Sequence, residues 1–179
     1  MSDAVERSRS LAVRERYEVA CDSYDELYKE EQAEKYYVAL KYSKPEGVVL
    51  DAGCGTGLLA EYLESVGASG RIALYICLDY SSCMIREARR RLETLGLHYA
   101  LLEASLESLP LASGSVDTVY SITVLNLLDD PVEGLRELRR VSRGPVLVTV
   151  LRESGATGPL LEEGCRLLES TSKDDVLAC

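Results

Sequence analysis

Residues 48–57 read Val48-Val49-Leu50-Asp51-Ala52-Gly53-Cys54-Gly55-Thr56-Gly57. The apolar residues at the start predict a buried strand, which delivers the acidic Asp51 into a turn with alternating glycines. Glycine permits positive φ and lets backbone amides approach a ligand closely. The amphipathic stretch that follows, Leu58–Val66, predicts a helix whose N-terminal amides face the loop. Together these elements predict a ligand site at the carboxyl end of the strand.

Further along, short apolar runs alternate with amphipathic segments. The later expected strands are Ile72–Leu78, Tyr99–Leu102, Val116–Ile122 and Pro145–Leu151, and the later expected helices are Ser82–Leu95, Asp130–Ser142 and Pro159–Glu169. Such alternation predicts right-handed β-α-β units and a parallel sheet covered on both faces. Strands that are apolar throughout agree, because they are buried on both sides. We therefore expect a doubly wound α/β fold, with a mainly parallel sheet in strand order 3-2-1-4-5.

The two ends of the chain differ from this pattern. Residues 5–41 predict helical structure with a break at Asp22-Ser23. Only 28 residues follow Leu151, and they predict one helix and a stub, Thr171–Cys179. The apolar strand Pro145–Leu151 would then have an open edge, which invites pairing with another chain. This favours a homodimer or an activating partner subunit.

Composition limits the classes of function. With 179 residues the chain has room for one domain, and its net charge of −10 disfavours a surface that binds nucleic acid through many phosphates. No apolar run reaches the roughly 18 residues needed to span a bilayer. The N-terminal sequence has no hydrophobic segment of the signal-peptide type. We expect a cytoplasmic protein that does not bind membranes.

The six cysteines and the single histidine, His98, show no metal-binding spacing, so we expect no metal site. The chain has one Asn, one Gln and three times more Arg than Lys. Because amides are thermolabile, their scarcity predicts a thermophile. The cytosol of hyperthermophiles is also where internal disulfides persist, so disulfides are allowed, with their pairing open.

The glycine turn resembles motif I of the class I S-adenosylmethionine-dependent methyltransferases, acidic-x-Gly-x-Gly-x-Gly. The resemblance implies that Asp51 helps hold the methionine amino end of the cofactor. It also implies that the loop of Gly53, Cys54, Gly55 and Gly57 passes beneath the cofactor. Dinucleotide-binding folds use Gly-x-Gly-x-x-Gly instead, and Leu58 stands where that motif has its third glycine. A dehydrogenase is therefore disfavoured.

A second motif of the family is matched by Leu78-Asp79-Tyr80-Ser81-Ser82-Cys83-Met84. Ligands of open α/β sheets lie beyond the carboxyl ends of the strands, where Asp79 would accept hydrogen bonds from both ribose hydroxyls. The resemblance places Tyr80 and Met84 against the ribose and adenine. The alternatives are a helix cap for Asp79 and plain core packing for Met84.

The segment Ser105-Leu106-Glu107-Ser108-Leu109-Pro110-Leu111 resembles the part of the family that meets adenine. On that register Ser105 replaces an Asp that usually meets the adenine amine, and a hydroxyl can still accept that hydrogen bond. Leu106 would place a backbone amide near the ring. If the register slips by two, Glu103 takes the place of Ser105.

Two further segments resemble the family. After the fourth strand, the resemblance places Ser121 at the cofactor and Asn126 facing the acceptor; alternatively, Asn126 satisfies local backbone groups. Near the N-terminus, Tyr17, the pair Tyr24-Asp25 and Tyr28 resemble a helical lid in which Tyr24 closes over the cofactor. The alternative is an amphipathic helix packed on the sheet.

These resemblances imply a helical lid of residues 1–44 on a Rossmann-like domain of residues 45–179. The family usually adds a helix and an antiparallel strand pair after its fifth strand. The 28 residues after Leu151 predict one helix and a stub, without room for both strands, so we expect a fold shortened at the C-terminus.

The implied function is methyl transfer from S-adenosylmethionine, with S-adenosylhomocysteine as product, to a small molecule, a protein or RNA. In-line displacement rests on alignment of the reactants, so neither a metal nor a catalytic triad is needed. A general base is needed only if the acceptor loses a proton, and no catalytic residue is assigned. We expect His98 to be structural. The alternative function is a non-catalytic S-adenosylmethionine-binding regulatory or scaffold subunit.

Overall fold

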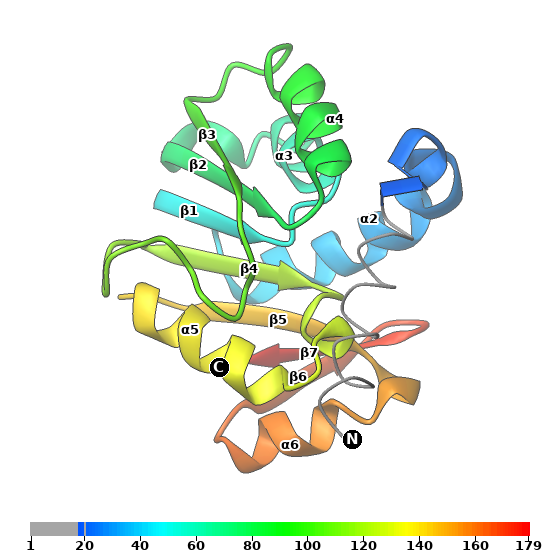
Figure 1. Ribbon diagram of the computed structural model, residues 1–179, viewed down its shortest axis with the longest axis vertical. Helices are drawn as coiled ribbons and strands as arrows, with labels where there is room; N and C mark the ends of the chain where they lie inside the picture. Colours follow the sequence, from blue (N-terminus) through cyan, green and yellow to red (C-terminus); the bar gives the residue numbers. More distant parts are fainter. Residues whose placement is uncertain (1–17, 20) are drawn as a thin grey trace, which may run out of the picture.

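The computed structural model describes residues 18–19 and 21–179. Figure 1 shows one central sheet with helices packed around it. In chain order the elements are η1 (Cys21–Ser23), α2 (Tyr24–Tyr42), β1 (Gly47–Ala52), α3 (Leu58–Ser65), η2 (Ser69–Arg71), β2 (Ile72–Asp79), α4 (Ser82–Leu92), β3 (Tyr99–Glu103), β4 (Thr118–Ile122), η3 (Leu125–Leu127), α5 (Pro131–Val141), β5 (Val146–Leu151), η4 (Arg152–Ser154), α6 (Thr157–Glu162), β6 (Arg166–Ser170) and β7 (Asp174–Ala178).

The sheet has seven strands in the order β3-β2-β1-β4-β5-β7-β6. The first five strands are parallel, which confirms the expected order 3-2-1-4-5. The register pairs Asp51 of β1 with Cys77 of β2 and with Tyr120 of β4. All five carboxyl ends therefore lie along one edge of the sheet, where the loops that carry polar residues gather.

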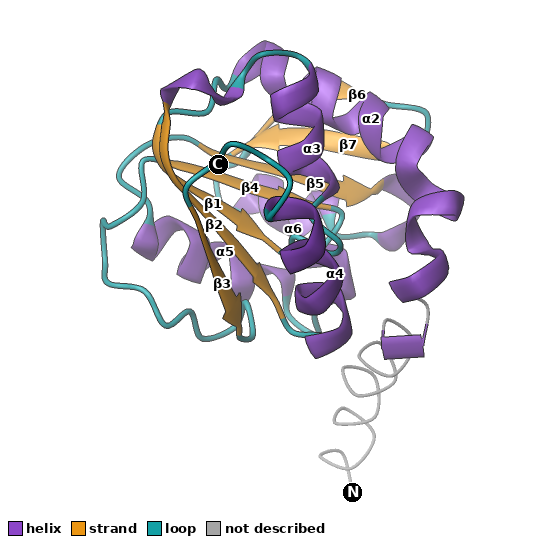
Figure 2. Ribbon diagram, turned by 90° about the horizontal axis from the view of Figure 1, so that it is seen from above, coloured by secondary structure: helices purple, strands orange, loops and turns teal. Residues whose placement is uncertain are grey.

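Helices cover both faces of the sheet (Figure 2). On one face, α2, α3 and α4 pack over a core that contains Leu59, Leu63 and Leu92. On the other, α5 and α6 contribute Leu135, Leu138 and Leu160 to a second core. Burial of each such leucine contributes about 1.5–3 kcal/mol, so the two cores hold the parallel strands rigidly between them.

The expectation for the C-terminal tail was wrong. A helix was expected over Pro159–Glu169, but α6 ends at Glu162 because Gly164 adopts φ +85° and closes the helix. The amides of Gly164 and Cys165 donate to the carbonyls of Leu161 and Leu160, both at 3.0 Å, in the usual manner of a glycine-terminated helix. The residues beyond Gly164 form β6, β7 and the turn between them, so the expected stub and the expected shortening of the sheet were also wrong.

The outer edge of β5 is consequently not open. It pairs antiparallel with β7, from Leu147 opposite Ala178 to Leu151 opposite Asp174. The sheet ends instead at β6, a short strand with an irregular register between Leu167 and Glu169. Irregular, charged edge strands resist pairing with another chain. Because β7 pairs with β5, the edge of β5 no longer favours a homodimer or a partner subunit.

The other boundaries differ less from the expected ones. The fourth strand begins at Thr118 instead of Val116, whose backbone makes an isolated bridge to Ser142. The helix expected over Ser82–Leu95 ends at Leu92. The break expected at Asp22-Ser23 coincides with the end of η1, and the part of the expected helical region before residue 18 lies outside the described residues. No helix within the described residues is long and apolar enough to cross a membrane.

All six cysteines are paired in the structure. The disulfides join Cys21 to Cys83, Cys54 to Cys77, and Cys165 to Cys179. The last of these ties the start of β6 to the residue after β7, 14 positions away. It closes the strand pair that the sequence interpretation missed.

We predict that the double substitution Cys165→Ser/Cys179→Ser lowers the free energy of unfolding by about 3 kcal/mol, because a disulfide that closes a loop of this length restricts the unfolded chain. Urea unfolding of the oxidised chains measures the difference. Mass spectrometry of the oxidised wild-type chain first verifies the pairing. Equal free energies of unfolding would contradict a stabilising role for this disulfide.

Candidate functional site

A cavity of about 230 Å³ opens at the carboxyl ends of β1, β2 and β4. This is the edge of the sheet at which open α/β folds bind their ligands. Its lining residues come from the loops after these strands, from the segment after β3 and from the start of α2: Tyr24, Gly53, Gly55, Asp79, Tyr80, Ser81, Met84, Ser105, Leu106, Glu107, Ile122, Thr123, Val124, Leu127 and Leu128.

The glycine loop forms the floor of the cavity. Gly53 adopts φ +81° and Gly55 φ +53°, backbone conformations that side chains disfavour. A Cβ atom built on Gly53 would lie only 2.3 Å from Cγ2 of Val124, so Val124 packs directly on the loop backbone. The amides of Gly53 and Cys54 donate to the carbonyl of Leu78 at 2.7 and 2.9 Å and fasten the loop to the end of β2.

Asp79 stands where β2 ends, beside this loop. Its Oδ2 accepts a hydrogen bond from the Gly55 amide and its Oδ1 accepts one from the Ser81 amide, both at 2.9 Å. Ser81, not Asp79, caps α4, because its hydroxyl accepts from the Met84 amide. Burial raises the pKa of Asp79 above its ordinary value, while the backbone donors partly offset that rise. The helix-cap alternative for Asp79 therefore does not describe this geometry.

Asp51 lies beneath the loop instead of in the main cavity. Its Oδ2 accepts a hydrogen bond from the Tyr75 hydroxyl at 2.5 Å. Burial raises the pKa of Asp51 to about 7, and the nearby Asp79 adds to the rise. Asp51 and Cys54 line a smaller cavity of about 20 Å³ that shares Tyr24 and Gly53 with the main one.

The side-chain amide of Gln32 borders that smaller cavity. Gln32 of α2 is buried, and its Nε2 donates to the Tyr24 hydroxyl at 3.2 Å. Its Oε1 has no hydrogen-bond partner within residues 18–19 and 21–179. Asp51 and Gln32 both line the small cavity, and two acceptor groups at one cavity suit a cationic group.

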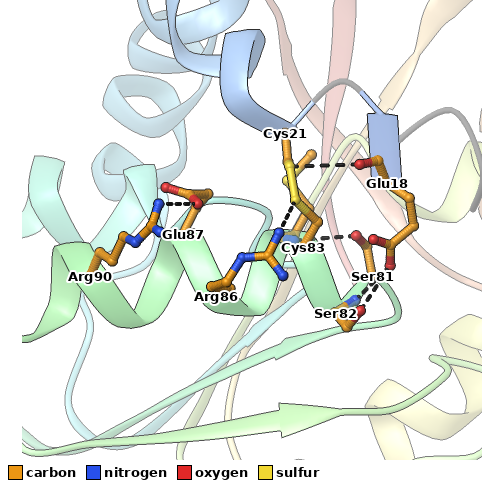
Figure 3. Close-up of a disulfide and its surroundings, with 9 residues drawn as sticks. Glu18, Cys21, Ser81, Ser82, Cys83, Arg86, Glu87 and Arg90 are labelled. Carbon is orange, nitrogen blue, oxygen red and sulfur yellow. Dashed lines mark hydrogen bonds and ion pairs between the residues drawn. A yellow bond between two sulfur atoms is a disulfide. The ribbon is translucent and has the colours of Figure 1, made fainter.

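The start of α2 lies over the glycine loop, where Cε1 of Tyr24 is 4.0 Å from the Cβ position of Gly55. A disulfide fixes this end of the helix: Cys21 of η1 is joined to Cys83, one residue before the cavity residue Met84 (Figure 3). Tyr24 also packs against Tyr28 in a tilted arrangement, with ring centroids 4.8 Å apart. Tyr17, the first residue of the expected lid motif, lies outside the described residues.

At the far end of the cavity, Ser105 and Leu106 follow β3. The Ser105 hydroxyl donates to a carboxylate oxygen of Glu107 at 3.2 Å and accepts from the Glu107 amide at the same distance. Ser105, Leu106 and Glu107 line the cavity, whereas Glu103 is exposed and does not. This placement favours the register that uses Ser105 over the one that uses Glu103.

Several predicted site residues lie outside the main cavity. Gly57 lies just before α3 and packs closely against Ala88. Ser121 is fully buried in β4, and its hydroxyl has no hydrogen-bond partner in the described part of the chain. Asn126, expected to face the acceptor, is buried in η3, and its Oδ1 accepts from the Leu151 amide at 3.4 Å. Asn126 thus satisfies a backbone group, as in the alternative, but that group belongs to β5 and is not local in sequence.

Conversely, the sequence interpretation did not assign Ser81, Glu107 or the wall residues Ile122, Thr123, Val124 and Leu128 to the site. The apolar run after the fourth strand was a signal for part of this wall. His98 lies just before β3, at the opposite edge of the sheet, where its carbonyl accepts from the Tyr75 amide. The described residues contain no cluster of His, Cys, Asp and Glu that could hold a metal.

Comparison with known proteins places these features in a family. The sequence model described as "Methyltransferase domain" matches residues 50–147. The chain is 36% identical over 126 residues to a ubiquinone/menaquinone biosynthesis C-methyltransferase of Stenotrophomonas maltophilia, covering 69% of this chain and 49% of that protein. It is 32% identical over 142 residues to a malonyl-[acyl-carrier protein] O-methyltransferase of Hahella chejuensis, covering 78% and 48%.

Among solved structures, a SAM-dependent methyltransferase from Aquifex aeolicus is similar in fold, with a TM-score of 0.73 and 20% identity. The match covers 90% of this chain and 97% of that one. The chain spans about half the length, or less, of the curated relatives it matches. The residues matched by the family model, 50–147, contain the glycine loop and Asp79.

We predict that Gly53→Ala destabilises the fold more than Gly67→Ala. Both positions have positive φ, which costs an alanine about 1–2 kcal/mol. Nothing lies within 4 Å of the Cβ position of Gly67, whereas that of Gly53 collides with Val124. Such crowding adds about 1–3 kcal/mol. Urea unfolding compares the two, and equal destabilisation would show that Val124 does not pack on the loop as described.

Proposed function

Because the chain belongs to the class I S-adenosylmethionine-dependent methyltransferase family, we propose that it moves a methyl group from S-adenosylmethionine to an acceptor beside Val124, Leu127 and Leu128. The observation that carries the proposal is the hydrogen bond from the Gly55 amide to Asp79. It brings the glycine loop and the acidic end of β2 together at one cavity.

The lining of the cavity suits this cofactor. Gly55 leaves the loop backbone open to a ligand, and the Asp79 carboxylate is placed to accept hydrogen bonds from two ribose hydroxyls. Tyr80, Met84 and Leu106 offer the apolar surface that an adenine ring needs. Ser105 and Glu107 would face the adenine amine, with Glu107 supplying a carboxylate where the family usually has Asp.

The methionine end would reach the smaller cavity beneath Tyr24. Asp51 and the unpaired Oε1 of Gln32 are both acceptors there, and an ammonium group would satisfy them. In this proposal Asp51 acts from below the loop while Gly53 and Gly55 form the surface above it.

The chain's own residues then act mainly by alignment. Bound S-adenosylmethionine supplies an already activated methyl group on its sulfonium. Tyr24, held over the loop by the hydrogen bond from Gln32 and by the Cys21–Cys83 disulfide, would close the lid and exclude water. Val124, Leu127 and Leu128 would orient an acceptor against this site, and such positioning can lower a barrier by several kcal/mol.

The acceptor is not carried over from the relatives, because two of similar identity are named for C-methylation and for O-methylation of different compounds. A partner subunit is not assigned either, since β7 covers the edge of β5 that suggested one. The alternative function, a non-catalytic subunit that only binds S-adenosylmethionine, differs from the proposed one in a single observable, turnover.

We further infer a thermophilic source and a cytoplasmic location. Glutathione keeps the thiols of most cytosolic proteins reduced, and hyperthermophiles are the exception. Three disulfides in a chain with a single Asn and a single Gln fit that exception.

The proposed function is tested with S-adenosylmethionine carrying a labelled methyl group and fractionated pools of metabolites, protein and RNA. We expect label in one pool and stoichiometric S-adenosylhomocysteine. Asp79→Ala is the matched control, because loss of charged hydrogen bonds costs about 1.5–3 kcal/mol of cofactor affinity. Cofactor binding without turnover on any pool would favour the scaffold alternative, and unchanged affinity in Asp79→Ala would refute the ribose assignment.

We also predict that cofactor affinity depends on pH through Asp51. Its pKa, raised to about 7 by burial, falls when an ammonium group binds, so binding favours the ionised form. The titratable groups that face it are Asp79 and the phenols of Tyr36, Tyr75 and Tyr120, whose own pKa values burial raises.

Affinity for S-adenosylhomocysteine should therefore rise about tenfold from pH 6 to pH 8, as measured by calorimetry. Any titration of the ligand itself affects the wild type and Asp51→Asn equally. Asp51→Asn should therefore abolish most of this rise. The same pH dependence in both chains would show that Asp51 does not hold the ammonium group. The stability of the free protein has the opposite pH dependence. Because the pKa of Asp51 is raised in the folded state, the free energy of unfolding falls as pH rises from about 4 to 7.

A further inference from the structure

A buried ion pair lies directly behind the cavity wall. Lys35 of α2 is 1% exposed and Asp174 of β7 is fully buried, and the Lys35 Nζ lies 3.2 Å from Oδ1 of Asp174. Lys35 also donates to Glu31 at 2.8 Å and to the Thr123 hydroxyl at 2.9 Å. Burying two charges is costly unless geometry and further hydrogen bonds compensate. An ion pair kept in this position therefore calls for an explanation.

The pair converges on an unusual backbone. Within the described part of the chain, Thr123 is the only non-glycine residue with positive φ, at +61°. Its hydroxyl donates to Oδ2 of Asp174 at 2.6 Å, and its amide donates to the carbonyl and the hydroxyl of Thr149, both at 3.0 Å. The Thr149 hydroxyl in turn donates to Oδ2 of Asp174 at 2.9 Å. Such a conformation persists only where the surroundings impose it, and it is common at functional sites.

The conformation of Thr123 determines where the next residues lie. Thr123 lines the cavity, and Val124 after it packs on the backbone of Gly53. Leu127 and Leu128, further along the same turn, complete that wall. A change of backbone at Thr123 would therefore move the wall away from the glycine loop.

We propose that Lys35 and Asp174 are positioning residues that hold Thr123 in its left-handed conformation, and thereby place the Val124–Leu128 wall against the glycine loop. This inference rests on the proposed function for its ligand, S-adenosylmethionine or its product. It makes the C-terminal strand pair part of the site, although no residue of that pair lines the cavity.

The test measures affinity for S-adenosylhomocysteine by calorimetry. In Lys35→Met/Asp174→Leu both charges are replaced by apolar side chains, an exchange that buried ion pairs often tolerate without loss of stability. In this variant the Thr123 hydroxyl loses its contacts with Lys35 and Asp174, and among the described residues only Thr149 still bonds to Thr123. We expect the left-handed conformation, and with it the binding-competent state, to be only fractionally populated. We expect affinity to fall about tenfold, as it does when that fraction falls tenfold.

Thr123→Gly added to this variant is the decisive arm, because glycine adopts positive φ without being held. We expect affinity to return to within about threefold of wild type, while thermal stability does not improve, since glycine also loosens the unfolded chain. A purely structural role for the ion pair predicts no such rescue. Wild-type affinity in Lys35→Met/Asp174→Leu, or failure of the glycine to restore binding in folded protein, would overturn the proposal.

Lys41→Ala is the matched control, because Lys41 also joins α2 to the C-terminal strand pair, through Glu169 at 2.7 Å, but on the exposed surface. It should bind as wild type does. NMR chemical shifts of Thr123 give a readout that needs no ligand: the left-handed signature should persist in Lys41→Ala and vanish in Lys35→Met/Asp174→Leu. If the wild-type chain did not bind S-adenosylhomocysteine, the proposed function would fall, and these shifts would still decide the role of the ion pair.

Discussion

The structure depends on one topological constraint, the reversal of strand order between β1 and β4. The chain runs outward from β1 through β2 to β3 and then returns to the other side of β1. Connections on the two sides of such a reversal leave the sheet in opposite directions, so a crevice opens above the carboxyl ends of the strands. The glycine loop after β1, Asp79 after β2 and Thr123 after β4 all border this crevice. Their proximity follows from topology, not from closeness in sequence.

The sequence predicted the parts of the molecule that local signals encode. Apolar runs and the glycine turn are read within short stretches of sequence, and the five parallel strands they predict agree with the structure. Gly53, Gly55 and Asp79 also line one cavity, as expected for a site at the carboxyl ends of the strands. The tail was misjudged because Gly164, a local signal for the end of α6, was overlooked, and because β7 begins with two aspartates that no strand pattern favours. Asp174 is tolerated in a buried strand because Lys35, far away in sequence, forms an ion pair with it, and the Thr123 and Thr149 hydroxyls donate to it.

Within the site, too, the sequence predicted what local signals encode and missed what depends on contacts between distant segments. The resemblance to the family placed Asn126 facing the acceptor, but the partner that fixes its side chain is the Leu151 amide, which only the folded sheet brings near. The sequence did not point to Thr123 or Gln32 as site residues, since their importance comes from contacts with other elements. Both ends of the described chain support the site: Cys21 joins the start of α2 to α4, and the surface pairs of Glu31 with Lys173 and Glu34 with Ser172 join α2 to the C-terminal strand pair.

The most direct test of this account is a crystal structure of the chain with S-adenosylhomocysteine. We predict that the ligand lies across the glycine loop, with its ribose hydroxyls within hydrogen-bonding distance of Asp79 and its amino group near Asp51 and Gln32. The homocysteine sulfur should face the wall of Val124, Leu127 and Leu128, with Thr123 still at positive φ. A ligand bound at any other edge of the sheet, or with its ribose away from Asp79, would contradict the account.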